Sequence, residues 1–246
     1  MKIACVIPAR LKSTRFPRKM LSFLQNKPLL QWVWEAANRT SAFDTICFAI
    51  DSLETAEVIE GFGGKYFMTS EDCASGTERL VELYNKNLIN ADIWVNWQGD
   101  EPFINEEMIH DLLRTCNEDS SDVWTLKKKI TKTEEIHNPQ IAKVVCDLDG
   151  YALYFSRSTI PHYRDACPDE SKIFFKHVGI YAFSKAALQK ISNLPSLCYL
   201  EDAEKLEQLR FLFYKLRIQV HETRRDVMGI DLPEHLAQAE QWAVDR

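Results

Sequence analysis

The stretch KIACVIPARLKSTRFPRKML, residues 2–21, joins a short apolar run to a strongly basic loop. The apolar run ends at Pro8 and is typical of a buried strand. The loop that follows has no glycine and carries five basic residues within ten positions. These are Arg10, Lys12, Arg15, Arg18 and Lys19. A surface turn does not need this much charge, so we expect the loop to hold an anion, and a solvated basic loop is the alternative.

The strand-then-helix order continues along the first half of the chain. Further apolar runs at 45–51, 65–70 and 92–102 predict strands, and amphipathic patterns at 28–39, 54–62, 77–86 and 105–116 predict helices. Asn105 is a plausible N-cap of the last of these helices. Such alternation predicts a doubly wound α/β fold with a mostly parallel sheet. Ligands bind such sheets at the carboxyl ends of the strands, where the basic loop begins.

The second half has a different pattern. Two β-rich runs flank Asp149-Gly150 in AKVVCDLDGYALYFSR, residues 142–157, which predicts a hairpin. A strand at 176–183, a helix at 201–213, a strand at 216–222 and a helix at 233–244 complete the chain. No linker or repeat separates the two halves. We therefore predict one domain, residues 1–246, with an antiparallel excursion around residues 140–195.

Composition narrows the class of protein. The chain has 246 residues, 46% of them hydrophobic and 27% charged, with a net charge of −6. A basic loop in an acidic chain argues against nucleic-acid or membrane-surface binding and favours a small anionic ligand. No apolar run approaches the roughly 20 residues that span a bilayer, and no signal peptide is recognisable. Seven cysteines without a C-x-x-C pair are typical of reduced thiols in a cytoplasmic protein.

Three short motifs could carry chemistry. The basic loop matches neither the P-loop nor the dinucleotide-binding glycine pattern, but Arg and Lys side chains suit phosphate contacts. In NWQGDEP, Asp100 follows a strand and a glycine, a position suited to a divalent metal or to a simple turn cap. In ASGTER, Gly76 permits close approach of a ligand, and Thr77 can begin a helix without any further role.

The motifs together resemble the 3-deoxy-manno-octulosonate (Kdo) cytidylyltransferase family over essentially the whole chain, from about Ile3 to Ala239. The quoted segments are IPARLKSTRFPRKML, MTSEDCASGTERL, VNWQGDEPFI, GYALYFSRSTIP, KHVGIYAF, LEQLR and GIDLPEHL. The resemblance implies transfer of CMP from CTP to the anomeric hydroxyl of Kdo, with release of pyrophosphate, for lipopolysaccharide assembly. It also implies a cytoplasmic, Mg²⁺-dependent homodimer that dimerises through the antiparallel excursion.

The resemblance also implies roles for individual residues. Catalysis is assigned to Arg10, Lys19 and Asp100, and metal binding to Asp100 and Asp231. The implied nucleotide-binding residues are Ala9, Arg10, Arg15, Lys19, Ser75 and Gln98. The implied sugar-acid residues are Arg157, His177, Tyr181, Glu207 and Gln208. Several have plainer alternatives: Arg157 as partner of a surface carboxylate, His177 and Tyr181 as core residues, and Glu207 as helix partner of Arg210.

The sequence departs from the family pattern at three positions. Arg18 and Met20 stand where relatives have glycine and proline, and Ile50 stands where threonine is usual. Arg18 either adds a phosphate contact or points into solvent, and we favour solvent. Two alternative functions stay open: the same reaction on the 8-amino analogue of Kdo, and a non-catalytic nucleotide-binding regulator.

Overall fold

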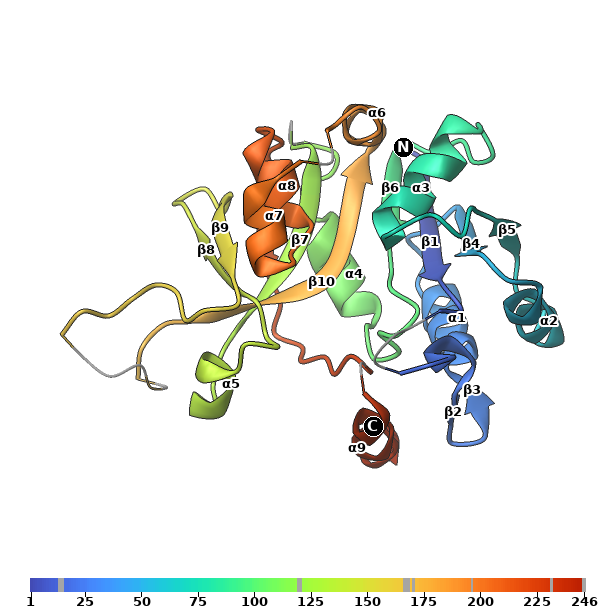
Figure 1. Ribbon diagram of the computed structural model, residues 1–246, viewed down its shortest axis with the longest axis horizontal. Helices are drawn as coiled ribbons and strands as arrows, with labels where there is room; N and C mark the ends of the chain where they lie inside the picture. The colour runs from blue at the N-terminus through green and yellow to red at the C-terminus, as the bar shows by residue number, and fades with distance from the viewer. Residues whose placement is uncertain are drawn as a thin grey trace. The chain divides into compact units, whose positions relative to one another are not determined.

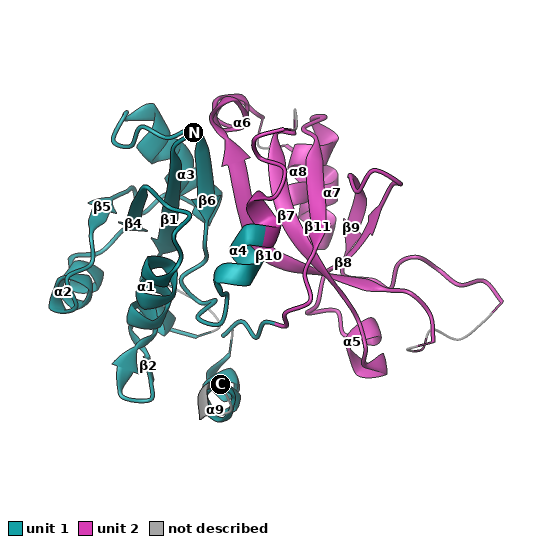
Figure 2. Cartoon of the chain, turned by 180° about the vertical axis from the view of Figure 1, so that it is seen from behind, with its two compact units in different colours: residues 1–110, 227–246 teal, residues 111–226 magenta. Residues whose placement is uncertain are grey.

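The computed structural model describes residues 1–12, 16–118, 121–165, 169, 171–195, 197–230 and 232–244. Its residues form two compact units, coloured separately in Figure 2. Unit 1 comprises residues 1–110 and 227–246, and unit 2 comprises residues 111–226. The expectation that the chain folds as a single domain stays a prediction.

The sheet of unit 1 is parallel, as the alternation predicts. Its strands are β1 (Ile3–Ala9), β4 (Thr45–Ile50), β5 (Tyr66–Met68) and β6 (Ile93–Asn96), in the spatial order β6-β1-β4-β5. β1 is an inner strand of this set, between β4 and β6, and its residues Ala4–Ile7 and Ala9 are fully buried. Its carboxyl end therefore delivers the basic loop between the ends of β4 and β6 (Figure 1).

The helices of unit 1 match the expected periodic segments. They are α1 (Leu29–Arg39), α2 (Leu53–Gly61), α3 (Gly76–Asn85) and α9 (Pro233–Val244), and α4 (Glu106–Leu113) crosses the boundary at residue 110. The Met108 amide donates to Asn105 Oδ1 at 3.1 Å, which confirms the predicted N-cap of α4. A 3-10 helix, η1 (Lys19–Leu21), and a small hairpin of β2 (Phe23–Leu24) and β3 (Lys27–Pro28) connect the basic loop to α1. No helix among the described residues has the length and apolarity needed to cross a membrane.

Unit 2 contains the antiparallel excursion. β10 (Phe175–Ser184) pairs antiparallel with β7 (Val123–Lys129) and with β8 (Lys143–Cys146), and β8 pairs antiparallel with β9 (Ala152–Ser156). Gly150, in the turn between β8 and β9, has φ +85°, a conformation that favours glycine. The predicted hairpin is confirmed. On the other side of β7, β11 (Ile218–Glu222) pairs in parallel.

The helices of unit 2 correct one prediction. Unit 2 contains the short helices α5 (Thr133–His137) and α6 (Lys185–Ile191). The single helix expected over 201–213 is instead two helices, α7 (Tyr199–Glu204) and α8 (Gln208–Phe213). Lys205 ends α7 in the left-handed conformation, with φ 52°. The Arg157 side chain donates to the carbonyl oxygens of Glu204 and Lys205 at 2.7 and 3.3 Å, which satisfies the backbone groups exposed by the break. Tertiary contacts thus interrupt a locally helical sequence.

Candidate active site

The basic loop leaves the carboxyl end of β1. Ala9 is the last, fully buried residue of that strand, whereas Arg10 is exposed and forms no ion pair or hydrogen bond with the described residues. An exposed guanidinium beside a rigid strand end is available to an anion. Arg15 lies outside the described residues.

Lys19 and Asp100 form an ion pair at this end of the sheet. Lys19 lies in η1 and is 6% exposed, and its Nζ is 2.5 Å from Asp100 Oδ2. The side chain of Asp100 is 22% exposed, so one face of the pair remains open to solvent. The structure thus brings together two of the three predicted catalytic residues.

Three segments approach closely around Gly76 and Gly99. A Cβ on Gly76 would lie 2.8 Å from Pro8 Cγ and 3.1 Å from the Gln98 amide, and a Cβ on Gly99 would lie 3.1 Å from the Pro8 carbonyl oxygen. Only glycine fits such contacts without displacing a neighbour. The end of β1, the start of α3 and the loop after β6 therefore meet, which places Ala9 and Gln98 in one cluster with Asp100.

The sequence indicates that Thr77 can begin this helix, but α3 begins at Gly76 and its N-cap is Ser75. Its Oγ accepts a hydrogen bond from Glu78 N at 3.2 Å, which identifies it as the N-cap of α3. Gln98 donates from Nε2 to Asn96 Oδ1 at 3.0 Å, so its side chain is held in a fixed orientation. A nucleotide-binding role for either residue stays a prediction.

Of the two predicted metal ligands, Asp100 lies among the described residues. Asp100 is a carboxylate next to the phosphate-binding candidates, and Mg²⁺ prefers one or two such ligands together with phosphate oxygens and water. Asp231 lies outside the described residues, but the amide of Ile230, its neighbour in sequence, donates to the Asp100 carbonyl oxygen at 3.0 Å. No group of three or more His, Cys, Asp or Glu side chains suited to a metal occurs in the described part of the chain. The donor set fits an ion bound mainly through its nucleotide.

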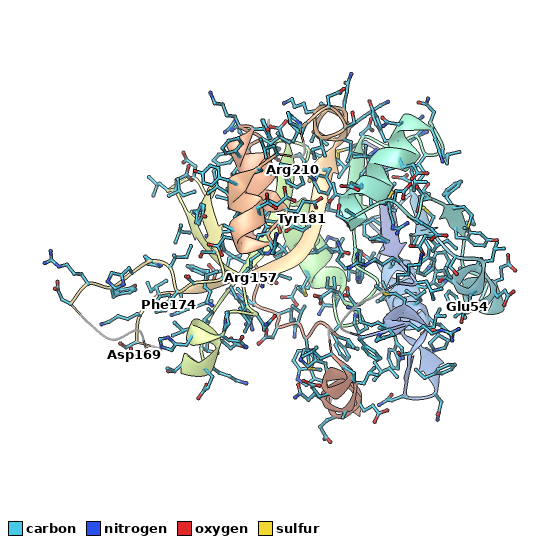
Figure 3. The ribbon with its side chains drawn as sticks, in the orientation of Figure 1. Glu54, Arg157, Asp169, Phe174, Tyr181 and Arg210 are labelled. Atoms are coloured by element: carbon cyan, nitrogen blue, oxygen red, sulfur yellow. The ribbon has the colours of Figure 1, made fainter. Side chains whose placement is uncertain are left out.

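Arg18 adopts the conformation that the family glycine would favour. Its φ is 58°, and its guanidinium pairs with Glu54 at the start of α2 while remaining 64% exposed. Figure 3 shows Glu54 on α2. The loop therefore keeps a glycine-like backbone at this position, and the arginine side chain lies at the surface, bound to a carboxylate.

A second cluster of predicted residues lies in unit 2, on β10. The His177 ring contacts Phe155 and Tyr181, with centroids 5.1 and 5.4 Å away, and its Nε2 is 2.9 Å from Thr125 Oγ1. The Thr125 hydroxyl donates to the Ile180 carbonyl at 2.8 Å, which assigns the ring proton to His177 Nε2. Burial lowers the pKa of His177 to about 3, so the ring is neutral.

Tyr181 and Glu207 belong to the same cluster. Burial, and secondarily the Glu207 carboxylate, raise the pKa of Tyr181, so its phenol is a hydrogen-bond donor at neutral pH. Arg210 pairs with Glu207 and Glu201, at 3.3 Å in each case, as the helix-pairing alternative anticipates. Gln208 is 3% exposed, and its Nε2 has no hydrogen-bond partner among the described atoms. A buried amide donor without a partner is costly unless a ligand satisfies it.

Arg157 has a structural role beside this cluster. Its guanidinium donates to the carbonyl oxygens of Glu204, Lys205 and Pro139, and its own amide donates to Glu204 Oε2 at 2.8 Å. Among the described residues the guanidinium is bonded to backbone carbonyl oxygens and to no surface carboxylate, contrary to the simpler alternative. Figure 3 shows Arg157, Tyr181 and Arg210, which come from the end of β9, from β10 and from α8. Sequence reasoning missed Thr125, since a threonine inside a strand carries no signal of its own.

Comparison with known proteins identifies the family to which this chain belongs. The cytidylyltransferase family matches residues 4–218. A protein named 3-deoxy-manno-octulosonate cytidylyltransferase from Thermodesulfovibrio yellowstonii is 43% identical over 98% of this chain and 97% of its own length. The chain belongs to the 3-deoxy-manno-octulosonate cytidylyltransferase family.

Other members of the family agree. The Porphyromonas gingivalis protein of the same name is 40% identical and covers 97% of this chain and 95% of its own length. A solved structure of CMP:2-keto-3-deoxy-manno-octonic acid synthetase complexed with CTP has 38% identity and a TM-score of 0.92, and covers 100% of this chain and 99% of that one. The family and the α/β fold predicted from sequence are therefore confirmed.

Proposed function

We propose that this protein transfers CMP from CTP to the anomeric hydroxyl of Kdo, in a Mg²⁺-dependent reaction that releases pyrophosphate. The observation that carries the proposal is the Lys19–Asp100 pair beside the exposed Arg10, in a chain 43% identical over 98% of its length to a Kdo cytidylyltransferase. These charges suit a polyphosphate and its counter-ion.

The proposed reaction needs no covalent bond between the protein and a substrate. The anomeric oxygen of the sugar acid attacks the α-phosphorus of CTP, the bond from that phosphorus to the bridging oxygen breaks, and pyrophosphate leaves as the hydroxyl proton is lost. Arg10, Arg15 and Lys19 would bind phosphate oxygens and stabilise the charge on the leaving group. Ala9, Ser75 and Gln98 would surround the cytidine. The protein thus acts mainly by positioning and by charge neutralisation.

Asp100 and Asp231 would hold Mg²⁺. The hydrogen bond from Ile230 N to the Asp100 carbonyl supports this assignment because it brings the chain just before Asp231 against Asp100. When bound, the ion supplies neutralisation of phosphate charge.

The cluster in unit 2 would bind the sugar acid. The phenol of Tyr181 and the buried amide of Gln208 offer donors to carboxylate and hydroxyl oxygens, and the unprotonated Nδ1 of the neutral His177 and the Glu207 carboxylate offer acceptors to hydroxyl groups. The unpartnered Gln208 Nε2 gives the strongest support, since a substrate oxygen would satisfy it. For Arg157, bound to backbone carbonyls, we retain a role at the edge of this pocket.

Assembly and location are further parts of the proposal. A homodimer formed through the antiparallel excursion is supported by β9, which pairs only with β8 among the described strands and exposes 61% of Leu153. A cytoplasmic location and a product used in lipopolysaccharide assembly are consistent with the family and with the free thiols of the cysteines that the structure describes.

A pyrophosphate-release assay with components omitted one at a time tests the function. We expect turnover only when CTP, Kdo and Mg²⁺ are all present. If the protein binds CTP but releases no pyrophosphate with any sugar acid, it is a nucleotide-binding regulator. Values of kcat/KM measured side by side for Kdo, its 8-amino analogue and a sialic acid then identify the substrate, and we expect Kdo to give the highest.

A further inference from the structure

Arg79 and Asp51 form a buried ion pair near the start of the basic loop. Arg79 Nη2, on α3, donates to Asp51 Oδ2, at the end of β4, over 2.7 Å, and the two side chains are 2% and 8% exposed. Buried charges are costly unless they are paired and hydrogen-bonded. This pair satisfies both conditions. Its remaining hydrogen bonds go to Leu11, in the basic loop, and to Thr69 and Ser70, which follow β5.

The second carboxylate oxygen of Asp51 holds the basic loop. Asp51 Oδ1 accepts a hydrogen bond from the backbone amide of Leu11 at 2.9 Å. That amide belongs to the peptide group joining Arg10 to Leu11, so the bond fixes the backbone from which the Arg10 side chain projects. A hydrogen bond to a charged acceptor is roughly twice as strong as a neutral one.

The other nitrogen of Arg79 holds the approach to α3. Arg79 Nη1 donates to Thr69 Oγ1 at 2.6 Å and to the Ser70 carbonyl oxygen at 3.1 Å. Thr69 in turn donates from Oγ1 to the Ile50 carbonyl at 2.9 Å. One guanidinium therefore joins the ends of β4 and β5 to the helix that begins at Ser75-Gly76.

We propose that Asp51 and Arg79 are positioning residues for CTP binding: their ion pair fixes the start of the basic loop relative to the start of α3. The proposal rests on the function proposed above. Both side chains are buried and bonded to protein atoms, so they act through Arg10 and the α3 N-terminus rather than by contact with the nucleotide. Preorganisation of this kind lowers the cost of ordering a loop when a ligand binds.

The test compares Asp51→Asn with Asp122→Asn. Asp122, in unit 2, is a close match because it also accepts from a cation, Lys190 Nζ at 2.6 Å, and from a backbone amide, Arg217 N at 2.9 Å. CTP dissociation constants are measured by calorimetry with Mg²⁺ present, alongside thermal unfolding and the KM values for CTP and Kdo. We expect Asp51→Asn to raise the CTP dissociation constant and KM at least tenfold with the KM for Kdo within threefold, and Asp122→Asn to leave CTP binding unchanged.

Arg79→Lys gives a graded version of the same test. Lysine keeps the charge but cannot bond to Asp51, Thr69 and Ser70 together, so we expect a smaller loss of CTP affinity than in Asp51→Asn. If Asp51→Asn is less stable to heat yet binds CTP as tightly as wild type, the pair is merely structural and the proposal is wrong. If wild type binds no CTP at all, the proposed function fails and this inference fails with it.

If the variants do not fold, hydrogen exchange in the wild-type protein still tests the proposal. Hydrogen exchange at the Leu11 amide should be slow, since its proton is bonded to a buried carboxylate. Exchange as fast as that of an exposed loop amide would overturn the proposal without any variant.

Discussion

Lys19 Nζ lies 2.5 Å from Asp100 Oδ2, so a cation and an anion 81 residues apart in sequence neutralise each other at the end of the parallel sheet. The proposed role of each partner requires this pair to be exchanged for contacts with phosphate oxygens and with the metal. Breaking the Lys19–Asp100 ion pair therefore costs free energy, which the new contacts with phosphate and metal must offset when CTP binds.

Lys19→Met should weaken CTP binding at least tenfold, about 1.4 kcal/mol, because a charge-assisted contact with phosphate is lost. Calorimetry with Mg²⁺ present measures the effect. Lys86→Met is the control, since Lys86, the C-cap of α3, is 55% exposed and pairs with Glu82 in that helix. Equal CTP affinities for wild type and Lys19→Met would remove Lys19 from the nucleotide site.

Arg18→Gly should leave the KM for CTP within threefold. The guanidinium is 64% exposed and pairs with Glu54, and such surface pairs contribute about 0–1 kcal/mol. Glycine relieves the positive φ at this position but costs unfolded-state entropy, so we expect the free energy of unfolding to change by no more than about 1 kcal/mol. A tenfold rise in KM, absent from Glu54→Gln, would instead identify Arg18 as a phosphate ligand.

His177 should make stability depend on pH. Its pKa is lowered to about 3 in the folded protein, against about 6.5 in the unfolded chain, so the unfolded state binds more protons between these values. The free energy of unfolding should therefore fall as pH drops below about 6.5 and should fall less steeply in His177→Gln. The free energy of unfolding is measured by denaturant titrations between pH 7.5 and 5. If it falls equally with pH in wild type and His177→Gln, the ring is not held neutral by burial.

Sedimentation at micromolar concentration should give twice the chain mass of 28.5 kDa. Leu153→Lys, which places a charge on the exposed edge strand β9, should shift the protein toward monomer, since lysine on an edge opposes strand pairing. Leu88→Lys, at a site 42% exposed in unit 1, is the control. A wild-type protein that is only monomeric would contradict the proposed dimer.

Local sequence patterns predicted most elements well. The final helix was expected over 233–244 and is observed at Pro233–Val244, because proline at its first turn and an amphipathic pattern are both local signals. The strands of unit 1 were found for the same reason. The break at Lys205 could not be predicted, since it depends on an arginine from the end of another strand.

The contacts within the candidate site could not be predicted from local sequence patterns. The resemblance named Lys19 and Asp100 but not their ion pair, and the Asp51–Arg79 pair joins residues 28 apart that no short motif links. Long-range partners depend on which strand ends become neighbours. That information comes from the order of strands in the sheet, not from any one segment.

The most direct test of the central claim is pyrophosphate release by wild type and Asp100→Asn in one assay with saturating CTP, Kdo and Mg²⁺. Asparagine keeps the shape of the side chain but removes the charge that would hold the metal, so kcat should fall at least ~100-fold. Circular dichroism should show the variant folded, and Asp122→Asn should retain wild-type turnover. Near-normal turnover by Asp100→Asn would contradict the account of this site as a metal-assisted cytidylyltransferase centre.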